Sequence, residues 1–156
     1  MESRQSTFAL SLAIMAQTAL HNSLEDIKVS LKTKLASLWA SFMFLYIYVD
    51  YFHLYMPGKI ADIQTGRVFE FDITQGFLFA ALALVTIPAL MIFLSVALPA
   101  KVNRRANIIV AAMYIPFTLF NLAGDAWMHM VFGAVVEVVL LYLIIRYAWK
   151  WPRIET

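Results

Sequence analysis

The chain has 156 residues, of which 62% are hydrophobic and only 14% are charged. Soluble domains are about half apolar and about a quarter charged, and a chain of this length has too little interior to bury the excess. The composition therefore predicts a membrane protein and excludes a soluble enzyme, a disordered tail and a nucleic-acid-binding protein. The absence of cysteine excludes disulfide exchange, thiolate catalysis and cysteine-ligated zinc or iron–sulfur sites.

The amino-terminal segment, residues 1–34, contains an apolar run at residues 8–20 that is too short to cross a bilayer. We interpret this run as a helix on the cytoplasmic membrane surface or against a neighbouring element, with a signal peptide as the alternative. Ser23, followed three residues later by Asp26, is typical of a helix start. Residues 24–34 would then form an amphipathic helix whose lysines contact anionic lipid headgroups.

Four apolar stretches are long enough to cross a bilayer as helices, which takes about 20 residues. They cover residues 35–56, 77–98, 106–123 and 126–149. Between them lie a polar loop at residues 56–76, a basic turn at residues 100–105 and a tight turn around Gly124 and Asp125. We therefore predict an all-α fold: an integral membrane four-helix bundle over residues 35–152, preceded by the interfacial amino-terminal helix.

The basic residues predict the orientation of these spans. Ten of the twelve lysines and arginines flank the spans on one side, and only Lys59 and Arg67 lie on the other. The positive-inside rule places the ten in the cytoplasm, so both chain ends are expected there. The loop at residues 57–74 and the turn at Asp125 then face outward. The four tryptophans fall near the predicted membrane interfaces, where aromatic belts form: Trp39, Trp127, Trp149 and Trp151.

Glu137 lies in the fourth span with three apolar residues on each side. At 1.5 Å per residue it is about 15 Å from Trp127 and about 14 Å from Arg146, which places it at the bilayer midplane. A carboxyl group there is costly and is a functional hypothesis by default. Glu137 is either a proton or cation relay or ligand anchor, or a protonated carboxyl that hydrogen-bonds across helices.

Two Asp/His pairs are predicted at the outer ends of the first and fourth spans. Asp50 and His53 are three residues apart and Asp125 and His129 are four apart, so each pair shares one helical face. Carboxylate and imidazole are ligand types of transition-metal sites, acid/base pairs and sites for quinone-like head groups. All four residues are therefore metal candidates, although a local hydrogen bond explains either pair equally well.

Asp125, His129 and Glu137 also form a polar stripe down the fourth span, with Gly133 among them. This stripe is either half of an access path from the outside or a helix face packed on its neighbours, with Gly133 as the point of close approach.

The third span contributes a second polar face. Tyr114, Thr118 and Asn121 share it by their spacing and are natural hydrogen-bond partners for the stripe on the fourth span. Pro88 and Pro116 lie within the second and third spans and are expected to kink them.

Five blocks of the sequence resemble a family of small bacterial inner-membrane proteins of unknown function. They are residues 38–52 (LWASFMFLYIYVDYF), 54–59 (LYMPGK), 98–104 (LPAKVNR), the apolar segment around Glu137, and 147–152 (YAWKWP). The resemblance covers about residues 24–152 and implies a four-helix bacterial membrane protein with no established activity. The architecture is also similar to the DoxX-like group and to quinone-linked thiol oxidoreductases, but the latter need cysteine pairs that this chain lacks.

Three functions are open for such a chain in a lipid bilayer. As a transporter, it moves a proton, an ion or a small molecule through a homo-oligomer, with Glu137 at the midplane, Asp125 and His129 at the outer entrance and Asn121 as a partner. As a non-catalytic subunit, it is a scaffold or binds lipid or a partner, and its polar residues hold helices together. As a membrane redox component, it binds a metal or quinone through the two Asp/His pairs. The sequence names no cofactor and favours a protein that is not an enzyme.

Overall fold

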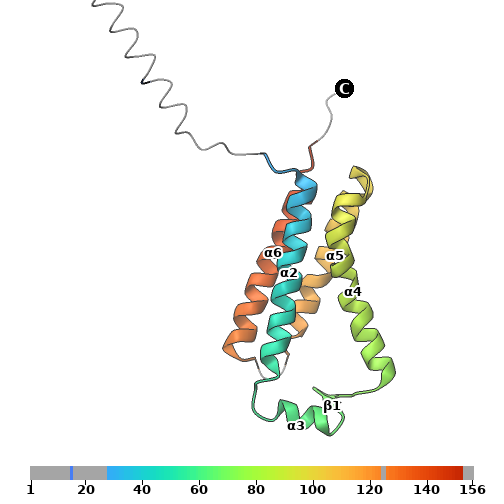
Figure 1. Cartoon of the computed structure of the whole chain (residues 1–156), viewed down its shortest axis with the longest axis vertical. Helices are drawn as coiled ribbons and strands as arrows, with labels where there is room; N and C mark the ends of the chain where they lie inside the picture. Colours follow the sequence, from blue (N-terminus) through green and yellow to red (C-terminus); the bar gives the residue numbers. More distant parts are fainter. Residues whose placement is uncertain (1–14, 16–27, 124–125, 153–156) are drawn as a thin grey trace, which may run out of the picture.

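The computed structural model describes residue 15, residues 28–123 and residues 126–152, and this part of the chain is mostly helical (Figure 1). Its four long helices are α2 (Leu31–His53), α4 (Gln75–Ala97), α5 (Ala100–Phe120) and α6 (Met128–Trp149). The short helix α3 (Lys59–Gln64) and an antiparallel hairpin of β1 (Arg67–Val68) and β2 (Phe71–Asp72) lie between α2 and α4. The polar loop predicted for residues 56–76 thus contains a short helix and a hairpin.

Helix α2 begins later than the predicted amphipathic helix. Ser30 is its N-cap, with Oγ accepting a hydrogen bond from the Thr33 backbone N–H at 3.2 Å. Residues 28–30 are not helical, so the prediction of one helix over residues 24–34 is wrong. The physical reason is the cap itself, which ends the helix ladder and turns the preceding backbone away. The predicted cap Ser23 and most of the apolar run lie outside the described residues.

Three helices in the described part of the chain, α2, α4 and α6, are long and apolar enough to cross a membrane. They match the first, second and fourth predicted spans to within a few residues at each end. The third stretch is α5, which begins at Ala100 rather than at residue 106. The predicted basic turn at residues 100–105 is therefore wrong, because Pro99 precedes a helix start and the basic residues occupy its first turns.

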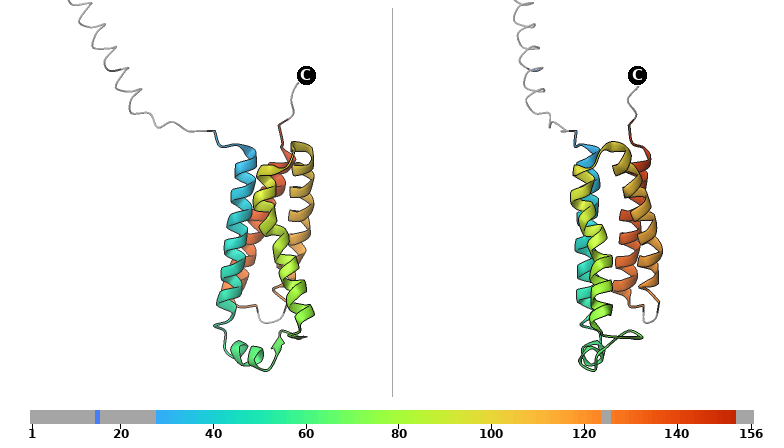
Figure 2. Two further views of the ribbon diagram at one scale, coloured as in Figure 1. Left: turned by 45° about the vertical axis from the view of Figure 1, so that its right-hand side comes forward. Right: turned by 90° about the vertical axis from the view of Figure 1, so that its right-hand side faces the viewer.

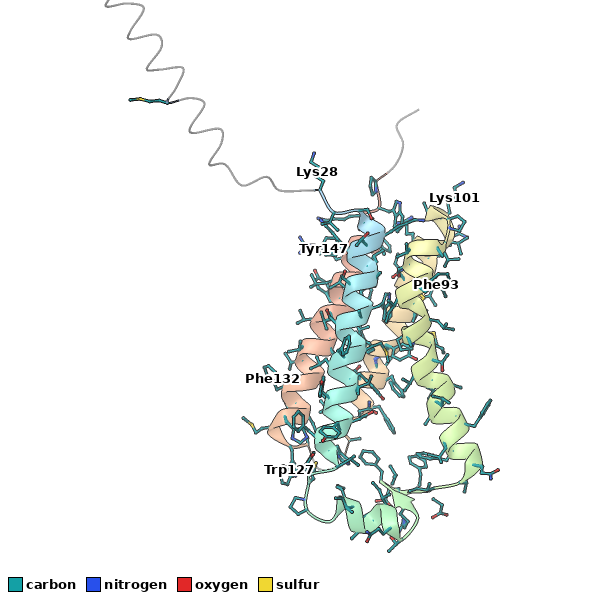
Figure 3. All side chains as sticks on the ribbon, in the orientation of Figure 1. Lys28, Phe93, Lys101, Trp127, Phe132 and Tyr147 are labelled. Carbon is teal, nitrogen blue, oxygen red and sulfur yellow. The ribbon has the colours of Figure 1, made fainter. Side chains whose placement is uncertain are left out.

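The four long helices run side by side (Figure 2). Helix α6 packs against both α5 and α2, and α2 also packs against α4. The start of α2, the α4–α5 turn and the end of α6 lie together at one end of the molecule, where Lys28 and Lys101 are found (Figure 3). We call this the basic end. The opposite end, which carries α3 and the two strands, is the hairpin end (Figure 1).

A buried polar network joins α2, α4 and α5 near the basic end. Asn107 Oδ1 accepts hydrogen bonds from Trp39 Nε1 at 2.7 Å and from Ser95 Oγ at 3.2 Å. Asn107 Nδ2 donates to the backbone and side-chain oxygens of Asn103, and Asn103 Nδ2 donates to the Ser95 carbonyl. All four residues are 0% exposed. Trp39 is thus a core residue whose indole N–H is satisfied by Asn107 inside the protein, and its depth near a membrane interface stays a prediction.

Pro88 removes one backbone hydrogen bond from the interior of α4, since proline has no N–H to offer the carbonyl four residues earlier. That carbonyl belongs to Leu84, and the Tyr114 hydroxyl of α5 donates to it. Tyr114 therefore does not serve the polar stripe of the fourth span, as the sequence suggested. It compensates for a proline in a neighbouring helix, which is how membrane helices tolerate one.

Replacing Tyr114 by phenylalanine is expected to lower the free energy of unfolding by about 1–2 kcal/mol, because the Leu84 carbonyl loses its donor. The same change in a Pro88→Ala background should cost less, because residue 88 then supplies its own N–H. Denaturant titrations of the four proteins in detergent, followed by circular dichroism, give the coupling energy. Equal costs in the two backgrounds would contradict the pairing.

Candidate functional site

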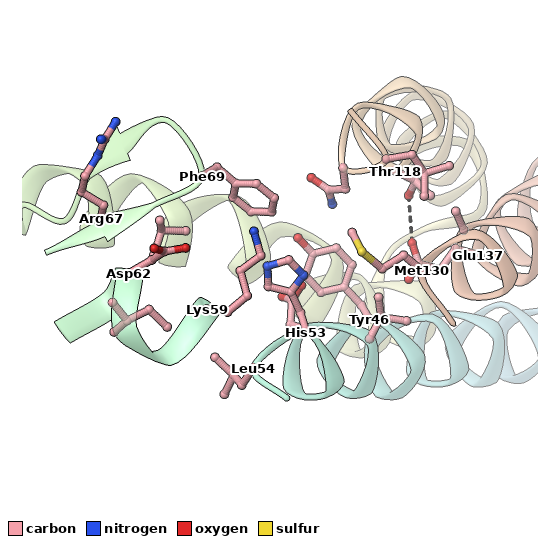
Figure 4. A pocket seen from close by; sticks show the side chains of 17 residues that line it. Tyr46, His53, Leu54, Lys59, Asp62, Arg67, Phe69, Thr118, Met130 and Glu137 are labelled. Carbon is pink, nitrogen blue, oxygen red and sulfur yellow. Dashed lines mark hydrogen bonds between the residues drawn. The ribbon is translucent and has the colours of Figure 1, made fainter. Parts of the chain in front are cut away.

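A cavity of about 280 Å³ lies between α2, α5, α6 and the α3–β1 segment (Figure 4). Two predicted site residues of α2, Asp50 and His53, line it together with Glu137 of α6 and Asn121, which follows α5. The structure therefore brings together four of the six residues singled out from the sequence. They come from three separate parts of the chain, and the side-by-side packing of α2, α5 and α6 places them around one space.

Glu137 forms the deep end of this cavity. It is 3% exposed, and its Oε2 accepts a hydrogen bond from Thr118 Oγ1 at 3.1 Å (Figure 4). Thr118 is itself 1% exposed, so the pair is enclosed by protein. The third-span face predicted to serve the stripe thus meets Glu137 through Thr118. A single hydroxyl donor leaves the other carboxyl oxygen available to the cavity.

Asp50 adds a second carboxyl group from the facing helix. It lies close enough to Glu137 and to the Tyr46 hydroxyl for their charges to interact. Asn121 lies beside the same Tyr46 hydroxyl. Two carboxyl groups, a phenol and an amide therefore share one space, and all four side chains accept hydrogen bonds.

The hairpin end of the cavity is covered by aromatic and basic side chains. The Phe69 ring stacks on His53, with ring centroids 5.1 Å apart and planes 28° from parallel (Figure 4). Lys59 Nζ lies 5.9 Å above the same Phe69 ring. Arg67 also lines the cavity and pairs with Glu70 at 3.6 Å. Sequence reasoning placed Lys59 and Arg67 on the outer side but did not connect them or Phe69 with the site.

His129 belongs to a different hollow, which it lines with Phe52, Tyr55, Met56 and Trp127. The polar residues of the helical part that share a cavity with Glu137 thus come from α2 and from α5 and its end, rather than from farther up α6. The stripe interpretation needs this correction for His129, because the first turn of α6 directs it toward the end of α2. Asp125 lies outside the described residues.

The predicted metal site at the two Asp/His pairs is neither confirmed nor contradicted by the positions of the histidines. His53 and His129 are near enough for their charges to interact, and His53 Nδ1 and His129 Nε2 are buried without a hydrogen-bond partner. Among residues 28–123 and 126–152, no three His, Asp or Glu side chains are grouped so that they could hold a metal ion. The predicted four-residue set includes Asp125 and is therefore not tested.

Gly133 is a point of close approach between α6 and α2. A Cβ atom built on it would overlap the Val49 Cγ2 methyl group and lie 3.6 Å from Val49 Cβ. The structure thus supports the interpretation of Gly133 as a point of close helix contact. The contact fixes the register of α2 against α6, and so the relative positions of Asp50 and Glu137.

The chain belongs to DUF6326, a family of unknown function, whose match covers residues 25–156. This confirms the resemblance to a family of unknown function that the sequence blocks indicated. Comparisons with curated proteins and with solved structures gave no match. The cavity and its residues are therefore the basis for inferring a function.

Proposed function

We propose that this chain is an integral protein of the bacterial inner membrane in which all four long helices form a transmembrane bundle. The apolar character of α2, α4 and α6 supports this topology. Helix α5 packs along α6 and carries its charges in its first turns, at the basic end. Under the positive-inside rule that end faces the cytoplasm, with both chain termini, and the hairpin end faces outward. The bacterial assignment rests on the sequence resemblance.

Within this topology, the protein translocates a proton or a small cation, and Glu137 is the exchange site. The observation that carries the proposal is the position of Glu137: buried near the middle of α6, at the deep end of a cavity that extends to the hairpin end. An ionisable group at such a depth, facing a cavity rather than lipid, is typical of proton and ion pathways. Asp50 and His53 provide polar steps between Glu137 and the outer surface.

The other half of the molecule is filled by side chains. Between Glu137 and the basic end, Trp39, Leu141 and Ile144 are all 0% exposed. Passage to the cytoplasm then needs a rearrangement of the helices or a path between subunits. A homo-oligomer, in which helices of neighbouring copies line the path together, fits the small size of the chain.

The test is proton flux into proteoliposomes under an imposed pH gradient. We expect the wild type to dissipate the gradient and Glu137→Gln to lose at least nine-tenths of that rate while keeping its helical content and oligomeric state. The matched control is Glu70→Gln, because Glu70 is exposed at the hairpin and lies outside the cavity lining. Unchanged flux in a well-folded Glu137→Gln protein would refute the proposal.

A second candidate function follows from the hydrogen bond between Thr118 and Glu137. This bond is what a scaffold or lipid-binding subunit would use to hold α5 to α6. In that case Glu137→Gln and Thr118→Val alter stability or oligomeric state, and the wild type carries no flux above protein-free vesicles. The same proteoliposome experiment therefore separates the two functions.

A further inference from the structure

The cavity is small for a ligand site, and its size limits what it holds. Ligand pockets usually span about 300–1,000 Å³, whereas this one has about 280 Å³. A quinone with its isoprenoid tail is too large to be enclosed. The volume accommodates a small organic cation together with water.

The two ends of the cavity differ in charge. The rim, formed by the α3–β1 segment, carries the basic side chains Lys59 and Arg67 together with the carboxyl group of Asp62. The deep part, lined by α2, α5 and α6, carries Asp50 and Glu137, and the lining described for these helices includes no lysine or arginine. A ligand that reaches the deep part therefore meets two carboxyl groups and is selected for positive charge.

The depths of these carboxyl groups follow from the helix contact. Gly133 packs on Val49, so Asp50 lies near the level of Gly133. Glu137 is four residues farther along α6, and Asp50 is one residue nearer the hairpin end on the antiparallel α2, so their backbone levels differ by about 7.5 Å at 1.5 Å per residue. An ammonium nitrogen holds carboxylate oxygens at about 2.8 Å, so it bridges two of them up to about 5.6 Å apart. Because both side chains enter the same cavity from facing helices, a nitrogen between the two levels has a carboxyl group on either side.

The remaining lining distinguishes among cations. A primary ammonium has three N–H donors, and besides the two carboxyl groups the cavity offers the Asn121 amide as a neutral acceptor. Val49, Met130 and Ala134 supply apolar surface for a short alkyl chain. A quaternary ammonium has no N–H to donate, and Ca²⁺ needs six to eight oxygen ligands.

We propose that the cavity binds a small primary alkylamine in its ammonium form between Asp50 and Glu137, with its alkyl chain against Val49 and Met130. The inference rests on the proposed function, because it names the cargo of the same site. It also adds a role for Asp50, which the sequence presented as half of an Asp/His pair open to metal, acid/base, quinone or purely structural interpretations.

The experiment uses the full chain in detergent micelles, with n-propylammonium chloride as the probe. Isothermal titration calorimetry and thermal unfolding should both show saturable binding to the wild type. We expect Asp50→Asn and Glu137→Gln each to weaken the affinity at least tenfold. Tetramethylammonium chloride and sodium chloride at the same ionic strength should give no saturable signal. Asp72→Asn is the matched control, because Asp72 lies in β2 outside the cavity lining and should bind as the wild type does.

Absence of saturable n-propylammonium binding would overturn the inference, and so would equal binding of tetramethylammonium. Wild-type affinity in both cavity variants would do the same. If Glu137→Gln fails to fold, Asp50→Asn decides alone, since Asp50 is exposed to the cavity rather than locked in the core. Flux that depends on Glu137 without amine binding removes only this inference, whereas amine binding without any flux removes only the proposed transport.

Discussion

Replacing Asn107 by leucine is expected to lower the free energy of unfolding by about 2–4 kcal/mol, because the change leaves several buried groups without partners. The Trp39 indole N–H loses its acceptor, and the Asn103 side-chain oxygen loses its donor. Neither has access to water, since both residues are 0% exposed. Denaturant titration of the detergent-solubilised protein, followed by circular dichroism, measures the loss.

Two further variants calibrate this result. Trp39→Phe removes one donor and keeps most of the ring volume, so its cost should be smaller, about 1 kcal/mol. Ser37→Ala removes an exposed hydroxyl of α2 and should stay within about 0.5 kcal/mol of the wild type. Hydrogen bonds between membrane helices average only about 0.6 kcal/mol in one well-studied case. A loss below 1 kcal/mol for Asn107→Leu would therefore mean that the network adds nothing beyond ordinary helix contacts.

The long apolar helices were predictable because their signal is carried by composition over some twenty residues. Their ends were not, because single residues decide them. Ser23 and Ser30 both precede plausible helices, and Ser30 caps α2. The basic residues after Pro99 looked like a turn, yet Asn103 and Asn107, four residues apart, are the buried face of the first turns of α5. That spacing was a signal the sequence offered.

The α3–hairpin segment was missed for a different reason. Its elements are short, and residues 56–76 contain no long apolar run or sustained alternation. Gly66 and Gly58 adopt positive φ values, as turns require, but Phe69 does so too, at φ 53°. A non-glycine residue in this region is uncommon and is not predictable from its type. The ring that covers His53 therefore could not be assigned to the site.

Within the site, the burial of Glu137 and the polar face that meets it followed from spacing along single helices. The pairing of Asp50 with Glu137 did not, because it depends on the register of α2 against α6. Sequence reasoning gave Glu137 partners on its own helix, at His129 and Asp125, and on the third span, but none on the first. In the structure His129 lies in another hollow. The contact of Gly133 with Val49 sets the register of the two helices, and that register brings Asp50 to the cavity of Glu137.

Replacing Gly133 by alanine should lower the free energy of unfolding by about 1–3 kcal/mol, the usual cost of overpacking a tight contact. The new methyl group would overlap Val49 Cγ2, and a β-branched side chain in a helix has one strongly preferred rotamer, so it has little freedom to move aside. The two helices must separate instead. Because Asp50 and Glu137 flank this contact on either helix, the variant should also weaken n-propylammonium binding, measured by the same calorimetry.

Helix propensity cannot cause the stability loss expected for Gly133→Ala, since alanine is intrinsically a better helix former than glycine by about 1 kcal/mol. Gly76→Ala provides the comparison: its Cβ would meet only Thr74 Oγ1 at 3.9 Å, an ordinary contact in the first turn of α4. That variant should be neutral or slightly stabilising. The double variant Gly133→Ala/Val49→Ala removes both γ-methyl groups of Val49, so the new methyl group no longer overlaps them, and it should recover most of the lost stability. If it does not, the overlap with Val49 is not the cause of the loss.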